Sequence, residues 1–417
     1  MQVLVDQEKK GMPSRRRRLI FSLIAILCGI ALPLMIIEIA LRFLPVSSAT
    51  GTMAVDVNNP IVRFTPNQLF TFSKGWKFDI VNTGRINNYG FTNNQDYTRH
   101  DPGEPLVIIG DSYVEAKMVP HAQTVQGRLA KLLENKRKVY SIGISGAQLA
   151  QYLAFADFAW SEFRPQGMVF VIVGNDFDES LTKYKNEPGL HHFQEDADSH
   201  DLKLVRIDYR PSLGKKLLRS SALARNLWGT VGISSIPSLL AQRFENGVQY
   251  VGNTAAYASE DRLADSRRVV DHFFSELPER IGLDKSRILF VIDAMRPEIY
   301  SELDLSRAKG SYFDLMRQYF LQQAKRNGYE AIDMQPRFVF RNRRDGSRFE
   351  FAIDAHWNGL GHEEAADAIA SSRMLDALLS GGDRVDPAII GKQSAKHFAS
   401  AVKDSKEDLS RSSRAPQ

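Results

Sequence analysis

The chain has 417 residues, of which 43% are hydrophobic and 25% are charged. This length fits one large domain with appended segments or two domains, and the composition is that of a folded protein. A single cysteine, Cys28, excludes an intramolecular disulfide framework and a cysteine-rich metal site. The net charge is +5, but residues 1–18 carry +4 and residues 392–417 carry +3, so the rest of the chain carries −2. A nucleic-acid partner is therefore not expected.

An apolar run follows the basic N-terminus and predicts a transmembrane helix. It covers residues 19–41 and holds one charged side chain, Glu38. As a helix it is roughly 35 Å long, enough to cross a hydrocarbon core of about 30 Å. The basic block Arg15–Arg18 precedes the run, so residues 1–18 are expected to stay cytoplasmic and the rest to be translocated. In a bacterium this is a single-pass inner-membrane protein with a periplasmic domain.

A cleaved signal peptide is the alternative interpretation of this run. Ser47-Ser48-Ala49 offers small residues for a cleavage site. The apolar region is longer than the roughly 7–15 residues of a cleavable signal, which favours an uncleaved anchor.

After the apolar run, the pattern predicts a linker (42–60), a small β-rich preface (61–104), a main domain (105–380) and a disordered tail (381–417). Short apolar runs in the main domain predict strands, at 106–109, 139–142, 168–173, 288–292 and 331–334. Amphipathic stretches predict helices, at 125–134, 147–162, 262–279, 312–327 and 363–379. This alternation favours an α/β domain whose parallel sheet has helices on both faces. The third and fourth strands are too far apart for one crossover, so residues 177–260 are an insertion.

Polar and glycine residues follow these strands where ligands bind in open parallel sheets, beyond the carboxyl ends. The segments are Gly110-Asp111-Ser112, Gly143-Ile144-Ser145-Gly146, Gly174-Asn175-Asp176 and, before the last helix, Asp354-Ala355-His356-Trp357-Asn358. We therefore expect them to meet at one edge of the sheet.

These residue types suit acyl transfer. The hydroxyl of Ser112 becomes a nucleophile when a base takes its proton, and His356 is the natural base, with Asp354 holding its imidazole. The oxyanion that forms needs preorganised donors. The backbone N–H groups of Ser112 and Gly146 and the side-chain amide of Asn175 are the candidates.

This distributed set resembles the SGNH (GDSL-type) hydrolase family over roughly residues 105–380, with the insertion outside the shared core. Gly110-Asp111-Ser112 looks like the first block of the family, Gly146 the second, Gly174-Asn175-Asp176 the third, and Asp354 with His356 the last. The resemblance implies a flavodoxin-like three-layer α/β/α fold, acyl-ester chemistry and a Ser-His-Asp triad.

The last block departs from the family, which usually spaces this pair Asp-x-x-His, whereas here only Ala355 intervenes. Residues two apart on an extended chain point the same way, so both side chains can still reach the site. The short spacing, followed by Trp357-Asn358, is similar to relatives that O-acetylate bacterial exopolysaccharides. Asn87-Asn88-Tyr89-Gly90-Phe91 also looks like segments that precede such domains in membrane-anchored bacterial relatives.

Several of these residues have other interpretations. Ser112 can serve as a helix N-cap, and Asn175 can close a turn. Asp354, His356 and His362 form a loose metal pattern, but we expect His362 to belong to the last helix and expect neither metal nor cofactor. The pair His191-His192 lies among polar residues and is expected to be solvated.

The sequence thus favours an extracytoplasmic serine esterase or deacetylase, acting on an acylated carbohydrate or another small or surface ester. One alternative is an O-acyltransferase of a cell-surface polysaccharide, in which a sugar hydroxyl intercepts the acyl-serine. With one predicted span, such an enzyme needs a multi-span membrane partner as acyl donor. The other alternative is a catalytically silent module that binds polysaccharide or scaffolds an envelope complex.

Overall fold

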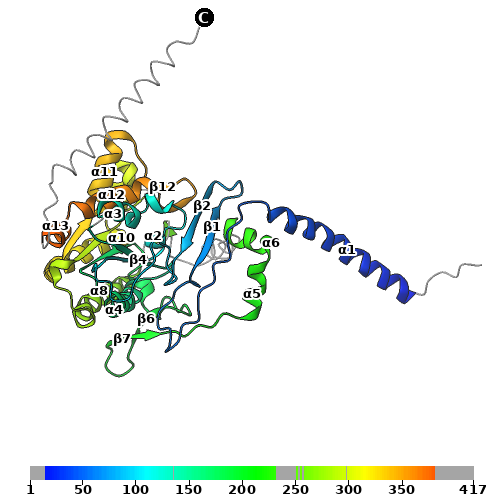
Figure 1. The fold of residues 1–417 in the computed structure, drawn as a ribbon, viewed down its shortest axis with the longest axis horizontal. Coiled ribbons are helices and arrows are strands. Elements are labelled where there is room, and N and C mark those ends of the chain that lie inside the picture. The colour runs from blue at the N-terminus through cyan, green and yellow to red at the C-terminus, as the bar shows by residue number, and fades with distance from the viewer. Residues whose placement is uncertain are drawn as a thin grey trace, which may run out of the picture.

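The computed structural model describes residues 15–134, 136–231, 250–251, 254–255, 258–296 and 298–380. The expected tail 381–417 and residues 1–14 of the expected cytoplasmic segment lie outside the described residues. A long apolar helix, α1 (Arg15–Leu41), projects from an α/β domain (Figure 1). Its 23-residue segment Leu19–Leu41 is long and apolar enough to cross a membrane, as predicted.

A five-stranded, all-parallel sheet forms the centre of the domain, in the order β11-β10-β5-β3-β4. The strands are β3 (Leu106–Gly110), β4 (Val139–Gly143), β5 (Gly167–Ile172), β10 (Ile288–Ile292) and β11 (Glu330–Asp333). All five correspond to predicted strands. Numbered in chain order, this is 2-1-3-4-5, the flavodoxin-like arrangement, and the strand order reverses between β3 and β5.

Helices cover both faces of the sheet because successive strand residues point to opposite sides. Met168, Phe170 and Ile172 of β5 join one apolar cluster, whereas Val169 and Val171 join the other. The first cluster includes side chains of α4 (Leu149–Phe163), α8 (Glu260–Arg280) and α10 (Tyr312–Arg326). The second includes those of α3 (Val125–Leu132), α11 (Met334–Asp345), α12 (Gly359–Ala370) and α13 (Arg373–Ser380). The predicted three-layer fold is confirmed.

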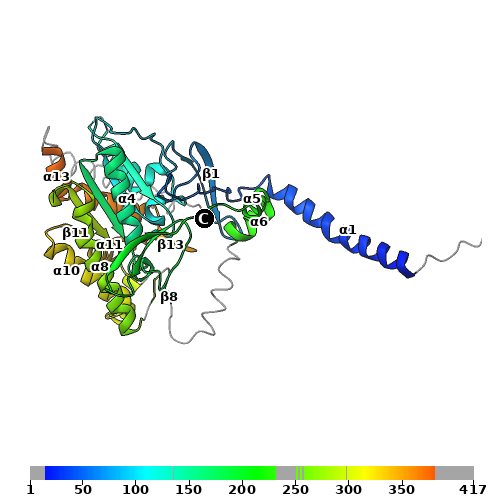
Figure 2. The ribbon, with the colours of Figure 1, turned by 90° about the horizontal axis from the view of Figure 1, so that it is seen from below.

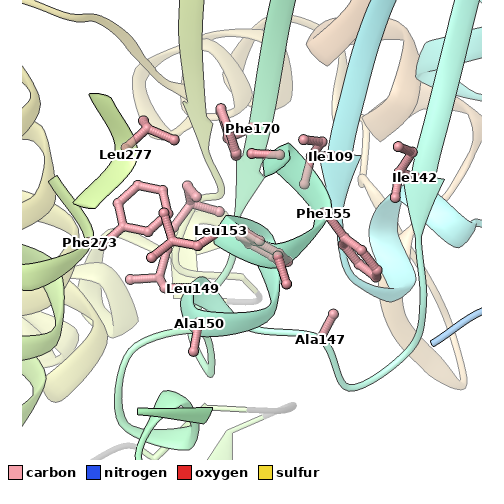
Figure 3. Close-up of a cluster of buried hydrophobic side chains, with 14 of the residues drawn as sticks. Ile109, Ile142, Ala147, Leu149, Ala150, Leu153, Phe155, Phe170, Phe273 and Leu277 are labelled. Atoms are coloured by element: carbon pink, nitrogen blue, oxygen red, sulfur yellow. The ribbon is translucent and has the colours of Figure 1, made fainter. Parts of the chain in front are cut away.

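Buried apolar side chains stabilise the packing of α4, α8 and α10 on their face of the sheet. Figure 3 shows Ile109, Ile142 and Phe170 on the strands facing Leu149, Leu153 and Phe155 of α4, with Phe273 and Leu277 of α8 beside them. Each large apolar side chain buried this fully stabilises the fold by about 1.5–3 kcal/mol.

The remaining elements are short. The antiparallel hairpins are β1 (Gln68–Lys74) with β2 (Ile80–Ile86), β6 (His191–Glu195) with β7 (Leu202–Arg206), β8 (Tyr250–Val251) with β9 (Thr254–Ala255), and β12 (Glu350–Phe351) with β13 (Asp354–Trp357). The short helices are α2 (Ser112–Glu115), η1 (His121–Gln123), η2 (Asp178–Ser180), α5 (Leu213–Ser220), α6 (Ala222–Arg225), η3 (Asn226–Thr230), η5 (Lys285–Arg287), η6 (Glu298–Tyr300) and α9 (Glu302–Ala308).

The C-terminal helices differ from the prediction. The helix expected at 363–379 is divided into α12 and α13, because the hydroxyl of Ser372 accepts from the N–H of Leu375 at 3.1 Å and starts a new helix. Helix α11, which contains four arginines, was not predicted from the sequence. Its apolar stripe is incomplete, and Arg341 instead hydrogen-bonds two glutamates of α12. Ion pairs therefore contribute to the packing of α11 on α12.

The expected solvation of His191 and His192 is wrong. Both side chains are buried, because the β6–β7 hairpin packs against α4. The ring of His191 contacts Gln151 and that of His192 contacts Gln148, at 3.2 and 3.0 Å. Burial lowers the pKa of each imidazole to about 4.

Candidate active site

Ser112 lies two residues after the end of strand β3, at the point where the strand order reverses. It is the first residue of α2, but the residue that caps this helix is Asp111, whose carboxylate accepts from the N–H of Tyr113 at 2.9 Å. The N-cap interpretation of Ser112 is therefore wrong, and its hydroxyl is left for other partners. Ser112 Oγ lies 3.1 Å from Asp111 Oδ2 and 2.7 Å from His356 Nε2.

Gly143 allows helix α2, which begins at Ser112, to pack closely against the end of strand β4. A Cβ at Gly143 would lie 2.6 Å from the N atom of Glu115 and 2.8 Å from the backbone carbon of Val114. The last residue of β4 therefore has to be glycine for α2 to pack over it.

Strand β13 carries both remaining members of the predicted triad. His356 Nδ1 hydrogen-bonds Asp354 Oδ1, and the same carboxylate oxygen accepts from the backbone N–H of His356 at 3.0 Å. Residues two apart on the strand thus share one side, as the Asp-x-His spacing required. The structure brings Ser112, His356 and Asp354 into one hydrogen-bonded chain, although 244 residues separate the serine from the histidine.

Lys74, at the end of β1, also reaches this chain. Its Nζ lies 2.7 Å from Asp354 Oδ2, and the side chain of Asp354 is only 2% exposed. Burial alone would raise the pKa of Asp354, but the hydrogen bond and charge of His356 and those of Lys74 hold it well below its usual value. The carboxylate is therefore ionised whenever His356 acts as a base. Sequence reasoning missed Lys74, because nothing near it in the chain marks it as a partner of Asp354.

A buried arginine holds the backbone between the two triad residues. Arg296 donates to the carbonyl oxygen of Ala355 and to the hydroxyl of Tyr113, both at 2.9 Å, and pairs with Asp293 at 2.6 Å. The indole N–H of Trp357 donates to the same aspartate at 2.8 Å. Asp293 and Arg296 follow β10, which is one of the predicted strands. The rule that ligands bind beyond the carboxyl ends of such strands therefore applied to these two residues as well.

Two of the three proposed oxyanion donors lie on the loops after the strands that flank β3. Gly146 follows β4 with a φ of +84°, and Asn175 follows β5. Asn175 Nδ2 donates to Glu179 Oε2 at 3.1 Å, and Lys185 Nζ pairs with that carboxylate oxygen at 2.7 Å and donates to the carbonyl oxygen of Gly146 at 3.1 Å. One ion pair therefore joins the two loops. Neither Glu179 nor Lys185 was singled out from the sequence, because both fall within the expected insertion, outside the segments that follow the predicted strands.

The Asn175 amide is held in one orientation. A carboxylate can only accept, so the NH₂ group must face Glu179, and its second hydrogen remains for another acceptor. The carbonyl oxygen Oδ1 is buried and has no partner among the described residues. The side chain therefore does not close the turn through a bond of its own oxygen, as the alternative interpretation required.

Buried carboxyl groups lie behind the site. Burial raises the pKa of Asp111 to about 6. Burial, together with the charge of Asp111, raises the pKa of Asp176 well above its usual value. Asp176 accepts from the backbone N–H of Val173 at 2.8 Å and bonds the hydroxyl of Tyr152 at 3.0 Å. These contacts hold the loop after β5 in place.

His362 lies outside the triad. It is buried on α12, where its Nδ1 accepts from the N–H of Val125 at 3.3 Å, and burial lowers its pKa to about 3. Within the described ranges, no group of three or more histidine, cysteine or acidic side chains is placed to hold a metal ion.

No family model and no curated protein matches the chain. Among solved structures, it is similar to a member of the lipolytic protein G-D-S-L family from Veillonella parvula DSM 2008 (12% identity, 64% of this chain and 97% of the other, TM-score 0.31). It is also similar to the acetyl xylan esterase AlAXEase (14% identity, 64% of this chain and 98% of the other, TM-score 0.35). A third similar structure is phospholipase A1 from Streptomyces albidoflavus NA297 (12% identity, 64% of this chain and 98% of the other, TM-score 0.34). Likenesses this weak add nothing to the strand order and side-chain contacts described above.

Proposed function

We propose that the chain is a serine esterase in which Ser112 is the nucleophile, His356 the general base and Asp354 the residue that orients the base. The observation that carries this proposal is the continuous hydrogen-bonded chain Ser112–His356–Asp354 at the topological switch point of the sheet. A silent binding module needs no such chain, so the geometry counts against that alternative.

The proposed reaction begins with the tautomer of His356. Because Asp354 is an ionised acceptor, it holds the proton on Nδ1 and leaves the lone pair of Nε2 facing Ser112 Oγ at 2.7 Å. Nε2 takes the hydroxyl proton as Oγ bonds to the ester carbonyl carbon. The resulting oxyanion accepts hydrogen bonds from the N–H of Ser112, the N–H of Gly146 and Asn175 Nδ2.

Collapse of this intermediate breaks the ester bond. The proton on His356 Nε2 goes to the leaving alkoxide, and the acyl group stays on Ser112. A water molecule then gives a proton to Nε2 and attacks the acyl carbon. As the bond between this carbon and Ser112 Oγ breaks, Nε2 returns the proton to Oγ and the acid is released. If a sugar hydroxyl takes the place of this water, the same steps transfer the acyl group.

We further propose that α1 remains attached as the membrane anchor, with the domain outside the cytoplasm. Glu38 near the end of α1 accepts hydrogen bonds from Ser221 Oγ and from the N–H groups of Ala222 and Leu223, at 2.8–2.9 Å. Leu41 packs in a small cluster with Ala222. Cleavage near residue 49 would remove these contacts from the folded domain, so they favour an uncleaved helix.

The substrate class proposed is an acylated carbohydrate or another ester at the cell surface, which a translocated and anchored domain would meet. The test is turnover of p-nitrophenyl acetate by the full chain in detergent, with and without a soluble glycan acceptor. Ser112→Ala and His356→Ala should each lower kcat by about 10³-fold or more, and combining them should add little. Substantial activity in a folded Ser112→Ala variant would refute the assignment. Faster release accompanied by acylated glycan would identify a transferase.

A further inference from the structure

Exposed apolar side chains gather on the face from which α1 leaves the domain. Figures 1 and 2 show α5 and α6 beside the end of α1 in both views. Large apolar residues around this point have at least half of their surface exposed: Phe43 (85%), Trp76 (77%), Leu213 (77%), Trp228 (55%) and Leu218 (53%). We call the segments 43–44, 75–77 and 213–230 that carry them the anchor-side face.

The contacts of α1 set the height of this face relative to a membrane. Glu38 lies less than one turn before the end of the apolar run, and its carboxylate bonds the first residues of α6. If α1 spans the bilayer, α6 therefore lies at the level of the bilayer surface, and α5 directly precedes it in the chain.

The β1–β2 turn belongs to the same face. The N–H of Gly75 donates to the carbonyl oxygen of Thr230 at 2.8 Å, so Trp76 on this turn is close to the segment that carries Trp228. Tryptophan is enriched where a membrane protein meets the lipid headgroups, because its ring is apolar and its N–H is polar.

Charge on this face fits an anionic surface. Residues 211–231 include four Lys/Arg and no acidic residue, and α5 is strongly amphipathic. A basic amphipathic helix with exposed leucines is typical of helices that lie in the interfacial layer of a bilayer, where basic side chains are attracted to anionic lipid. The segment therefore combines exposed apolar side chains with a positive net charge, the two properties of a lipid-binding segment.

We propose that the anchor-side face rests on the anionic bilayer in which α1 is embedded, with α5 and the two tryptophans in the headgroup layer. The domain is then held in one orientation and does not swing freely on its anchor. This inference extends the proposed anchoring.

The anchor-side face also lies beside the proposed active site. Lys74 at the start of the β1–β2 turn bonds Asp354, and a Cβ at Gly75 would lie 2.8 Å from Ile353 Cδ1. The β1–β2 turn that carries Trp76 therefore contacts the segment that carries the triad carboxylate. The proposed active site then lies close to the part of the domain that meets the membrane.

The four tryptophans provide the test. The full chain is placed in nanodiscs that contain phosphatidylglycerol and lipids brominated near the headgroup, and tryptophan quenching is measured. We expect strong quenching in the wild type and loss of most of it in the Trp76→Phe/Trp228→Phe variant. Trp160→Phe, on α4, is the matched control and should leave the quenching unchanged.

The outcomes separate the proposals. Quenching in the double variant equal to that of the wild type would overturn the docking inference, with circular dichroism showing that the variant is folded. A chain that does not elute with nanodiscs would overturn the anchor itself. Neither result bears on the triad, which is tested by ester turnover of Ser112→Ala. As a second perturbation, Leu213→Ser/Leu218→Ser should reduce the quenching of both tryptophans, and an unchanged value would also overturn the inference.

Discussion

The ion pair between Lys185 and Glu179 is predicted to hold the oxyanion donors without contacting substrate. Replacing Lys185 by Met removes the partner of Glu179 and the donor to the Gly146 carbonyl, while keeping the length of the side chain. The two charged atoms are 2.7 Å apart and the side chains are 21% and 25% exposed. This places the pair between a surface ion pair, worth at most about 1 kcal/mol, and a buried one, worth about 3–5 kcal/mol when broken.

A loss of about 1.5–2 kcal/mol in the transition state corresponds to a roughly 10- to 30-fold lower kcat. KM should change little, because the ground-state carbonyl makes the weaker contact with these donors. The assay is p-nitrophenyl acetate hydrolysis over a range of substrate concentrations, with thermal unfolding measured on the same preparation. Lys185→Arg, which keeps the charge, should recover most of the activity.

Lys183→Met is the matched control. Lys183 pairs with Asp265 at 2.8 Å but is 62% exposed and contacts neither loop of the site. Its loss should change kcat less than twofold. If Lys185→Met behaves like Lys183→Met, or if Lys185→Met and Asn175→Ala lower kcat additively, the ion pair does not position the oxyanion donors.

Three further results are expected. Asn175→Ala should lower kcat by roughly 10²–10³-fold with little change in melting temperature, whereas a destabilised but fully active variant would remove Asn175 from the site. Lys74→Met should lower kcat by roughly tenfold because Asp354 loses its ammonium partner, and wild-type kinetics in this variant would show that the contact is dispensable. Asp176→Asn should raise the melting temperature relative to the wild type, by an amount that grows as the pH rises above about 4. The folded state holds the Asp176 proton more tightly than the unfolded state, so the wild type loses stability as the pH rises through this range. The amide of the variant does not titrate and so does not cause this loss. A difference that does not vary with pH would contradict the raised pKa.

Much of the fold could be predicted because a parallel sheet is buried on both faces. Its strands are then short, continuous apolar runs, such as Leu106–Gly110 and Ile288–Ile292, which stand out from the amphipathic helices between them. The position of Ser112 and of the two flanking loops followed from the rule that ligands bind beyond the carboxyl ends of such strands. These signals are local in the sequence.

The residues that sequence reasoning missed depend on tertiary packing. Lys74 lies 280 residues before Asp354 in the chain, and a lysine at the end of a hairpin strand has no local mark of such a contact. The burial of His192 depends on how the β6–β7 hairpin packs on α4, which polar neighbours in the sequence do not reveal. Arg296 is different, because it follows a predicted strand and the strand-end rule applied to it as well.

The proposed role of Ser112 is tested most directly by covalent labelling. The full chain is incubated with a fluorophosphonate, which bonds to a serine oxygen only when a base has activated it, and the adduct is located by peptide mass spectrometry. We predict one adduct per chain on Ser112, formed at least 10³-fold more slowly in His356→Ala and absent in Ser112→Ala. An adduct on another residue, or labelling of Ser112 at the same rate in His356→Ala, would contradict the proposed mechanism.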